Sequence, residues 1–438
     1  MARIYKISII SSLAGFLFGF DTVVISGADQ QLQNIWNTSD IFHGSVVMSM
    51  ALWGTVLGAL LASYPCDKFG RKKTLLLIGF LYLISALGSA FANDPNTFSL
   101  FRFLGGIGIG LSTVAAPTYI SEIAPTDKRG RLVILYQFNL VFGILIAYTS
   151  NYFFQNFGEG SWRWMMGVEA FPAFLYLIGL GFIPESPRWL VVKKNNISLA
   201  KKIHKEINHK LLTKDELSAF SKNINKSEPL FCQKYFKPLM FAFFISFFNQ
   251  LSGINAFLYY APRIFEIAGL KSNSAFLSSI GIGLINLIFT ILGMYLIDKM
   301  GRKTLLKIGS VGYIFSLSMI AISFIDNWGG IFVPLFLFVF IASHAVGQGS
   351  IIWVFTAEIF PNHLRAKGLS FGISVHWILA SLITLLMPSF LSILSNPGYI
   401  FLFFAFVMIF QLIFALTIMP ETKNISLEEL TKKLIKNT

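Results

Sequence analysis

Charged side chains are scarce in this chain: 13% of its 438 residues are charged, while 55% are hydrophobic. A soluble domain carries about 25% charged residues, so this chain has too little polar surface to cover a core in water. Its apolar runs are about 20 residues long, which is the length of a helix that crosses a bilayer. Because only helices and closed barrels satisfy every backbone group in lipid, and these runs do not alternate as strands do, we predict an all-α membrane protein.

Cysteines and catalytic motifs are scarce too. The two cysteines, Cys66 and Cys232, both fall in connections expected on the cytoplasmic side, so neither a disulfide nor a cysteine-based metal site is predicted. The sequence shows no Ser-His-Asp arrangement, zinc motif or phosphate loop, and we therefore expect no enzyme, no metal and no cofactor. GGIGIG at 105–110 resembles a dinucleotide fingerprint, but it lies inside an apolar run with no strand before it. It predicts close helix packing instead.

Twelve apolar runs are long enough to span a bilayer as helices. They are expected near residues 7–27, 42–64, 74–92, 97–120, 131–154, 163–183, 237–261, 275–297, 304–324, 330–356, 368–394 and 397–419.

One connection between these runs is long. It is polar, rich in lysine and too poor in apolar residues for a core of its own, which predicts a cytoplasmic linker with short helices. The expected organisation is an N-terminal six-helix half at 1–183, the linker at 184–236, a C-terminal six-helix half at 237–419 and a cytoplasmic tail at 420–438.

The formal net charge of +14 reflects where the basic residues lie. Nearly all of the 35 lysines and arginines fall in connections on the side of the N-terminus and the linker. The opposite side has only Arg163, Arg263 and Lys271, and Arg102 falls within a run. The positive-inside rule therefore predicts that both termini are cytoplasmic. The basic excess indicates topology, and nucleic acid is not an expected partner.

The two halves of the sequence repeat. Three motifs of the first half recur in the second half at intervals of 231 to 236 residues. They are DKFGRKK at Asp67, which recurs as DKMGRKT at Asp298; SEIAPTDKRG, which recurs as AEIFPNHLRA; and PESPR, which recurs as PETK. Each motif falls at a cytoplasmic helix end, and Gly70 and Gly301 permit tight turns there. A glutamate and an arginine seven residues apart can form an ion pair that keeps the cytoplasmic side closed. The alternative interpretation is that these charged residues only set the orientation of the chain in the membrane. The predicted cytoplasmic gate contains Asp67, Arg71, Glu122, Arg129, Glu185, Arg188, Asp298, Arg302, Glu358, Arg365 and Glu421. Glu169 is expected to be structural within this cytoplasm-facing network.

Over essentially its whole length, the chain resembles the sugar porter family of the major facilitator superfamily. The resemblance lies in DKFGRKK, RGR at 129–131, PESPR, QLSGIN at 250–255, DKMGRK and PETK. It implies alternating access, with a sugar bound near the midplane while the two halves rock around it. Bacterial sugar–proton symporters are the nearest likeness and glucose facilitators a more distant one. We accordingly expect a monomer in the lipid bilayer of a bacterial inner (plasma) membrane, with a small-molecule sugar and protons as partners.

A sugar offers hydroxyls around an apolar ring, so its site needs amides that donate and accept, and an aromatic face. The candidates for substrate binding are Gln137, Asn249, Gln250, Asn255, Tyr259, Asn286, Gly349, Trp353, His376 and Trp377. From the residues alone, contacts between helices or anchoring at the interface explain each of them equally well. The resemblance implies that the amides of Gln137, Gln250, Asn255 and Asn286 contact the sugar. It also implies that Trp353 stacks on the sugar, that Trp377 is a second pocket tryptophan and that Gly349 lies near the sugar.

Three positions depart from the family pattern. Asn249 stands where the family usually has a glutamine, which leaves one sugar hydroxyl to water. His376 stands where bacterial relatives have a glutamine; it either hydrogen-bonds the sugar or packs between helices. GQG at 347–349 lacks the proline usual before Trp353.

A single carboxylate, Asp21, lies inside the apolar stretch GFLFGFDTVVISG. At 1.5 Å per residue, Asp21 and Arg102 lie at comparable depth, so the two can pair. An unpaired charge at the bilayer centre costs about 2.5–3.5 kcal/mol, and either pairing or protonation lowers this cost. A static ion pair and a proton carrier are both compatible with the residues. The resemblance implies that Asp21 is the proton-coupling aspartate and Arg102 its partner.

These features predict a secondary active transporter that imports a monosaccharide by proton symport and alternating access. A facilitative uniporter is the alternative, and its sugar flux would ignore the proton gradient. A membrane sugar sensor is a third interpretation, although such sensors usually carry long tails. QLS at 250–252 resembles the triplet of facilitators that take glucose and reject fructose. It implies an aldohexose, with glucose first and xylose second.

Overall fold

In the computed structural model, residues 2–125, 128–208, 212, 217, 228–361, 364–425 and 427–434 are described. Every regular element in these ranges is a helix. Much of the predicted linker, at 209–211, 213–216 and 218–227, lies outside the described residues. Twelve helical stretches are long and apolar enough to cross a membrane, which confirms the predicted fold class: Arg3–Ile35, Asp40–Leu61, Arg71–Phe91, Pro95–Ile123, Arg129–Phe154, Ser161–Gly181, Gln233–Ile267, Ser272–Met300, Arg302–Ile325, Phe332–Glu358, Arg365–Ile393 and Gly398–Ile418.

The chain forms two compact units. Unit 1 comprises Met1–Thr22, Met50–Ala147 and Phe157–Ser227, and unit 2 comprises Val23–Ser49, Tyr148–Asn156 and Glu228–Thr438. Two long helices, at residues 2–35 and 129–154, therefore each contribute to both units. The predicted division at residues 183, 236 and 419 stays a prediction.

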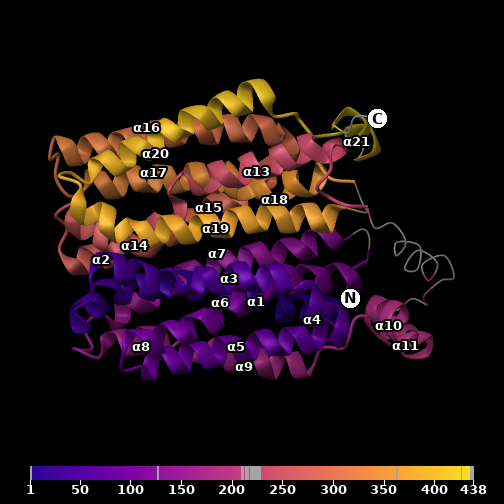
Figure 1. Ribbon diagram of the computed structural model, residues 1–438. Helices are drawn as coiled ribbons and strands as arrows, with labels where there is room; N and C mark the ends of the chain where they lie inside the picture. The colour runs from indigo at the N-terminus through magenta and orange to yellow at the C-terminus, as the bar shows by residue number, and fades with distance from the viewer. Residues whose placement is uncertain are drawn as a thin grey trace. The chain divides into compact units, whose positions relative to one another are not determined.

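The helices that build unit 1 lie along one another as a bundle (Figure 1). They are α1 (Ala2–Ile35, shared), α3 (Met50–Leu61), α4 (Ser63–Phe69), α5 (Arg71–Phe91), α6 (Pro95–Ile123), α7 (Arg129–Phe154, shared), α8 (Ser161–Gly167), α9 (Ala170–Gly181), α10 (Pro187–Lys194) and α11 (Ile197–Asn208).

Close packing of α6 explains its glycines. A Cβ added to Gly106 would lie 1.9 Å from the carbonyl oxygen of Ala51, and one added to Gly110 would lie 2.3 Å from that of Thr55. Both carbonyls belong to α3, so the GGIGIG stretch lets two backbones touch. The prediction that this stretch packs helices closely is confirmed.

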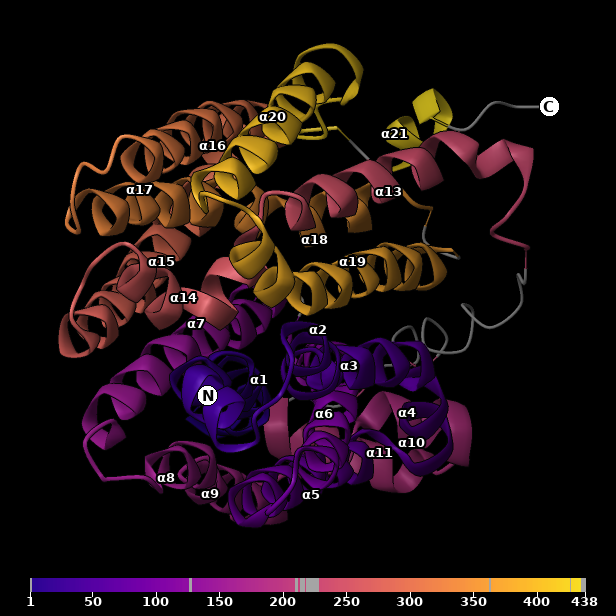
Figure 2. The ribbon, with the colours of Figure 1, turned by 60° about the vertical axis from the view of Figure 1, so that its left-hand side comes forward.

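The helices of unit 2 are also arranged as a bundle, seen from another side in Figure 2. They are α2 (Asp40–Phe42), η1 (His43–Met48), η2 (Gln233–Tyr235), α13 (Phe236–Gln250), α14 (Ile254–Ile267), α15 (Ser272–Met300), α16 (Arg302–Ile325), α17 (Phe332–Val346), α18 (Gln348–Glu358), α19 (Arg365–Ile393), α20 (Gly398–Ile413), η3 (Phe414–Ile418) and α21 (Leu427–Leu434).

Four of the runs predicted as single helices are broken. The run at 42–64 is divided among η1, α3 and α4, with interruptions at Ser49 and Ala62. Gly253, with φ of 87°, separates α13 from α14, and Gly347 separates α17 from α18. Val168 and Glu169 form a turn between α8 and α9. Non-helical backbone at membrane depth is tolerated where protein buries it. Buried polar side chains lie beside these breaks: Gln250 and Asn255 beside Gly253, Gln348 beside Gly347, and Glu169 in the turn before α9.

Two buried prolines interrupt helices of unit 2, and tyrosines satisfy the carbonyls they leave free. Pro262 cannot donate to the carbonyl of Leu258, and the hydroxyl of Tyr148 donates to that oxygen instead, at 2.7 Å. In α19, Pro388 frees the carbonyl of Thr384, which accepts from the hydroxyl of Tyr260 at 2.9 Å. These bonds tie α7 to α14, and α14 to α19.

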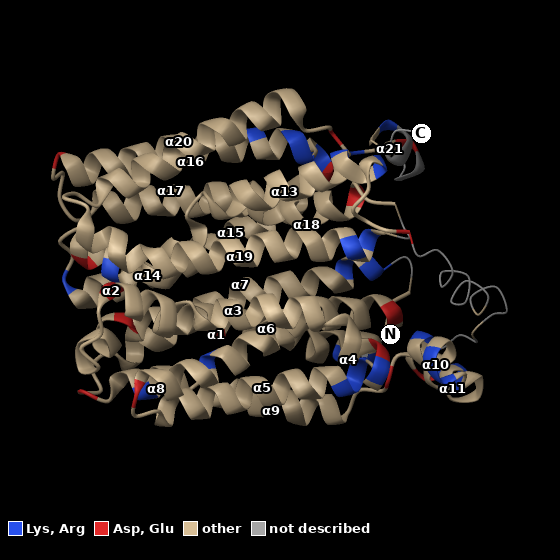
Figure 3. Cartoon of the chain, in the orientation of Figure 1, with Lys and Arg blue, Asp and Glu red and all other residues tan. Residues whose placement is uncertain are grey.

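Basic residues collect at one end of the helices in each unit (Figure 3). In unit 1 they surround α4, α10 and α11, and in unit 2 they surround α21 and the first turn of α19. This is the end that carries the repeated motifs. The prediction that both termini are cytoplasmic rests on this distribution of basic residues. The orientation of the chain in the membrane stays a prediction.

Candidate functional site

The intramembrane aspartate and arginine of unit 1 form the predicted pair. Arg102 donates through Nη1 to Oδ1 of Asp21, and through Nη2 to the backbone oxygen of Asp21 at 2.9 Å. Both side chains are buried, with exposed fractions of 1% and 0%. The fork of the guanidinium thus holds both the carboxylate and the main chain of α1, and the depth argument from the sequence is confirmed.

A second carboxyl belongs to this cluster. Glu169, at the break between α8 and α9, is fully buried and interacts with both Asp21 and Arg102. We expected it in the cytoplasm-facing network, and this expectation was wrong because the break in the helix could not be predicted from hydropathy. With every group ionised, two carboxylates and one guanidinium leave one negative charge in an apolar setting. One proton on either carboxyl would make the cluster neutral.

Helix α1 is packed tightly against α7 in unit 1. A Cβ on Gly15 would lie 2.5 Å from the carbonyl oxygen of Tyr136, and one on Gly19 would lie 1.8 Å from that of Leu140. Gln137, half-buried, lies on this stretch of α7. The helix that carries Asp21 and the helix that carries Gln137 are therefore in backbone contact, and neither can shift alone.

The amides of unit 2 form a connected network around Gln250. Its Nε2 donates to Oδ1 of Asn249 at 2.9 Å, and its Oε1 accepts from Nδ2 of Asn255 at 2.8 Å. The same Nε2 lies 3.0 Å from Nε2 of His376. Asn249 and Gln250 end α13 while Asn255 begins α14, so the break at Gly253 brings them together.

Aromatic rings flank this network. The ring of His376 lies 5.1 Å from that of Trp353 and 4.7 Å from that of Trp377. Tyr259 is buried one turn beyond Asn255 on α14. The arrangement joins hydrogen-bonding amides to apolar faces, the combination that a sugar ring requires.

The remaining candidates are placed around these. Asn286 accepts from the hydroxyl of Thr290 at 3.3 Å, and a Cβ on Gly349 would lie 3.2 Å from the carbonyl oxygen of His344. His344 itself lies 2.7 Å, through Nδ1, from the hydroxyl of Tyr313. Gln137 belongs to unit 1 and the other nine candidates to unit 2. Their roles in binding stay predictions.

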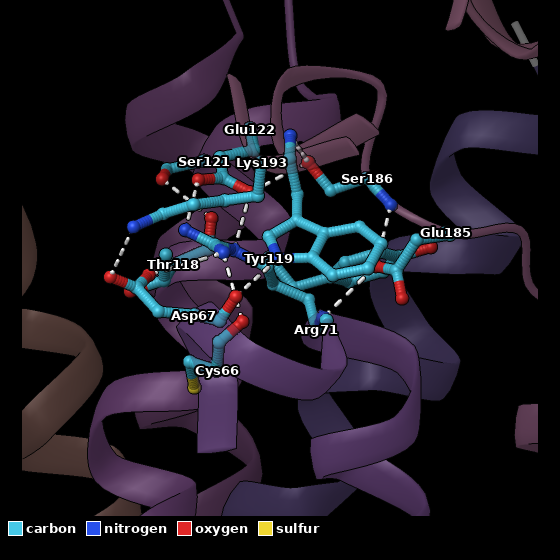
Figure 4. A network of polar contacts seen from close by, with 12 residues as sticks. Cys66, Asp67, Arg71, Thr118, Tyr119, Ser121, Glu122, Glu185, Ser186 and Lys193 are labelled. Carbon is cyan, nitrogen blue, oxygen red and sulfur yellow. Dashed lines mark hydrogen bonds and ion pairs between the residues drawn. The ribbon is translucent and has the colours of Figure 1, made fainter. Parts of the chain in front are cut away.

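The first copy of the repeated motif builds an ion-pair network in unit 1 (Figure 4). Arg71 lies 2.9 Å from Glu122 and 3.5 Å from Asp67. The carboxylate of Glu185 accepts from the backbone N–H of Arg71 at 3.0 Å, and burial raises its pKa despite these donors. Gly70 has φ of 99°, and a Cβ there would lie 2.3 Å from Oε2 of Glu185. The glycine is needed both for the turn and for the approach of the carboxylate.

The second copy repeats this network in unit 2. Arg302 donates through Nη2 to Glu358 at 2.8 Å, and its backbone N–H donates to Glu421 at 3.0 Å. Arg302 also lies 3.4 Å from Asp298. Gly301 has φ of 89°, and a Cβ there would lie 2.5 Å from Oε2 of Glu421. The internal repeat of the sequence is thus a repeat of contacts.

The arginines that hold the two glutamates differ from those we expected. Glu122 pairs with Arg71 and Glu358 with Arg302, whereas Arg129 and Arg365 begin α7 and α19 and make neither ion pair in the described part of the chain. A spacing of seven residues spans the loop between two helices, so it does not bring the side chains together. Arg188 lies half-buried in the first turn of α10.

The sequence pattern of the family described as "Sugar (and other) transporter" matches residues 7–434. The chain belongs to this sugar transporter family. Its members are transporters rather than enzymes, and the family assignment agrees with the resemblance to the sugar porters of the major facilitator superfamily. Similar proteins include an arabinose-proton symporter of Bacillus subtilis, 35% identical over 100% of this chain and 96% of the relative. A D-xylose-proton symporter of Escherichia coli is 32% identical over 98% and 95%.

Solved structures of the sugar transporter family share this fold. The inward-open conformation of the xylose transporter XylE from E. coli matches with a TM-score of 0.88 and 31% identity, covering 99% of this chain and 100% of that one. XylE bound to 6-bromo-6-deoxy-D-glucose matches with a TM-score of 0.82 and 31% identity, covering 99% of each chain.

Proposed function

We propose that this chain imports a monosaccharide together with a proton, by alternating access across a bacterial inner membrane with both termini in the cytoplasm. The observation that carries the proposal is the buried ion pair of Asp21 and Arg102, with the buried carboxyl of Glu169 close enough to influence it electrostatically. Relatives named as arabinose–proton and xylose–proton symporters support the coupling. A multi-pass membrane protein is supported by the twelve spans.

A proton supplies enough energy for this task. Moving one proton down roughly 100 mV releases about 2.3 kcal/mol, and one pH unit adds about 1.4 kcal/mol. Together, ~3.7 kcal/mol would support roughly 500-fold accumulation of a sugar carried one per proton.

In the proposed mechanism Asp21 carries the proton. When the cluster is open to the outside, protonation of Asp21 weakens its hold on Arg102 and frees α1 to shift with α7, which carries Gln137. When the cluster is open to the cytoplasm, the proton leaves and Arg102 stabilises the charge that remains. The backbone contacts of Gly15 and Gly19 transmit the shift from α1 to α7.

The proposed sugar site uses the amide network of unit 2. Gln250 and Asn255 exchange hydrogen bonds with the sugar hydroxyls, while Trp353 and Trp377 cover its apolar face. His376 contributes its ring nitrogen to the network. We propose an aldose as substrate, glucose first and xylose second, because QLS at 250–252 resembles the glucose-selective triplet and relatives are named for xylose, arabinose and glucose.

The test is sugar uptake into proteoliposomes with and without an imposed pH gradient, beside counterflow without one. The unmutated protein should concentrate sugar only with the gradient. Asp21→Asn keeps the shape of the side chain and removes its titration, so accumulation should disappear while counterflow survives. Asp326→Asn, an exposed carboxylate at the end of α16, is the matched control and should behave as the unmutated protein.

Two outcomes would change the proposal. If the unmutated protein ignores the gradient, the chain is a facilitative uniporter. If Asp21→Asn still concentrates sugar, Asp21 is a structural ion-pair residue and the proton takes another route.

A further inference from the structure

A second ionic cluster, with Asp29 and His43 buried at its centre, lies within unit 2 at the helix ends opposite the repeated motifs. Helix α15 (Ser272–Met300) ends directly before Gly301 of the motif, and α14 leads into its start. The end of α14 is therefore at the far side, which the basic residues predict to be the outside. The outer cluster consists of Asp29, Gln30, Gln33, Asp40, His43, Arg263 and Glu266.

Residues of α1 and α2 hold two residues of α14 in this cluster. Arg263 donates to Oε1 of Gln33 at 2.9 Å, and lies 3.5 Å from Oδ2 of Asp29. It also lies 3.9 Å from Asp40. Three residues further along α14, Glu266 accepts from Nε2 of Gln30 at 2.6 Å. The last turns of α14 are thus fastened to α1 at two successive points.

A histidine holds the other oxygen of the central aspartate. Nε2 of His43 lies 2.8 Å from Oδ1 of Asp29, and both side chains are buried, with exposed fractions of 0% and 1%. Nδ1 of His43 lies 3.3 Å from the hydroxyl of Thr38. Asp29 therefore bridges His43 on one oxygen and Arg263 on the other.

The fastened part of α14 begins just beyond a weak point in the helix. Tyr260 has φ of −120° and ψ of 19°, and Pro262 follows inside the helix. Without the bond that Pro262 cannot make, the segment at 261–267 is held by fewer helical bonds to the part that carries Asn255 and Tyr259. Contacts at its far end therefore decide where this segment lies.

The charges around His43 indicate how a proton would act. The groups that face it are Asp29 from α1, Asp40 from α2, and Arg263 and Glu266 from α14. Helix α19 also packs on η1, but its lysine and arginine lie in its first three residues, far along the helix from Leu385 at the contact. A proton on His43 adds positive charge beside Asp29 and reduces the negative charge that attracts Arg263.

We propose that Asp29, His43 and Arg263 form a proton-sensitive latch that holds the outer segment of α14 against α1 and loosens when His43 is protonated. These residues position a transport helix; none is proposed to touch the sugar. Histidine is the side chain that ordinarily changes charge between about pH 5 and 8. Acid outside would thus free the segment next to the proposed sugar site, under the same condition that loads Asp21. The link to transport rests on the proposed function, whereas the latch itself does not.

Hydrogen exchange on the purified full-length protein tests the latch without sugar. Peptides covering 261–267 are compared between the unmutated protein and His43→Gln, at about pH 7.5 and at about pH 5.5, on either side of the histidine range. Comparing the two proteins at one pH cancels the intrinsic dependence of exchange on pH. Peptides of α16 serve as the internal reference for intact folding.

The two proteins should exchange alike at the higher pH, because the amide introduced by His43→Gln still donates to Asp29. At the lower pH the unmutated protein should exchange several-fold faster in 261–267 only. Asp29→Asn and Arg263→Gln should each exchange fast at the higher pH already and gain nothing in acid. Each of these variants counts only if its α16 peptides match those of the unmutated protein.

Equal exchange of the unmutated protein and His43→Gln at both values would overturn the proposal. Should His43→Gln fail to fold, slow exchange of Arg263→Gln at the higher pH would overturn it independently. The exchange experiment uses no sugar and measures no transport. A failure of proton-driven uptake would therefore contradict the proposed function without affecting the test of the latch.

Discussion

At the scale of single residues, the buried carboxyls of unit 1 are the groups proposed to carry the coupling chemistry. Asp21 and Arg102 could be paired from the sequence because each is the one ionisable group in a long apolar stretch of its own helix. Glu169 could not be placed, since its depth depends on the turn between α8 and α9. The outer cluster could not be predicted either, because His43 and Asp29 lie 14 residues apart on different helices.

Removing the second carboxyl should change the acidity at which the transporter works. Glu169→Gln deletes a negative charge beside Asp21, so proton binding to the cluster becomes weaker. Proton-driven uptake should persist but require a more acidic outside. The measurement is initial uptake rate against outer pH, with the exposed Glu159→Gln as control. A profile identical to that of the unmutated protein would remove Glu169 from the coupling cluster.

The amide network predicts which single changes weaken binding. Gln250→Ala should lose hydrogen bonds to sugar and Trp353→Ala should lose stacking, each costing on the order of 1–3 kcal/mol of binding free energy. Calorimetry on purified variants measures this directly. Gln411→Ala is a matched control, because Gln411 is a buried amide of the same unit that bonds Gln348 and Ser310 instead. Unchanged affinity in both test variants would place the sugar elsewhere.

At the scale of elements, hydropathy predicts where each helix crosses but not where it breaks. All twelve runs were predicted, because apolar length is imposed by the bilayer. Two of them extend further than predicted, the first to Ile35 where the prediction ended at 27, and the seventh to Ile267 where it ended at 261. The breaks at Gly253, at Gly347 and before α9 were missed. Glycine is common inside membrane helices and does not by itself mark a break. These breaks bring Gln250 next to Asn255, and Glu169 next to Arg102, so much of the site was beyond the sequence pattern.

The tyrosines that satisfy proline-freed carbonyls should matter for stability. Tyr148→Phe leaves the buried carbonyl of Leu258 without its donor, which should cost about 1–3 kcal/mol of unfolding free energy. A lower Tm in detergent is the expected readout. Tyr399→Phe removes a hydroxyl from a half-exposed side chain and should leave Tm nearly unchanged. Equal shifts in the two variants would mean that the carbonyl finds another partner.

At the scale of the whole molecule, the repeat extends from sequence letters to contacts. Arg71, Glu122 and Glu185 in unit 1 correspond to Arg302, Glu358 and Glu421 in unit 2. The sequence predicted this duplication correctly because the motif residues are short-range landmarks at helix ends. It assigned the wrong arginine partners, since pairing depends on how separate helices pack.

Substrate choice belongs to the same scale, because uptake requires the intact chain. A panel of unlabelled sugars is expected to compete with labelled glucose in proteoliposomes, with glucose strongest and xylose next, since xylose lacks only the hydroxymethyl group. Fructose and inositol should compete poorly. If labelled glucose is not taken up, or if fructose or inositol competes better than unlabelled glucose, an aldohexose is excluded as the preferred substrate.

The hydrogen bonds of Gln250 have a consequence for turnover. Its amide bonds Asn249 and Asn255 and lies against His376. At the proposed site, a sugar hydroxyl would therefore replace one of these hydrogen-bond partners of Gln250, so the enthalpy gained per contact would be small. Weak net binding is an advantage for a carrier, because a sugar held too firmly would dissociate slowly and limit the number of cycles per second. After the sugar leaves, the amide of Gln250 would again bond Asn249 and Asn255, so no buried amide would be left without a hydrogen-bond partner.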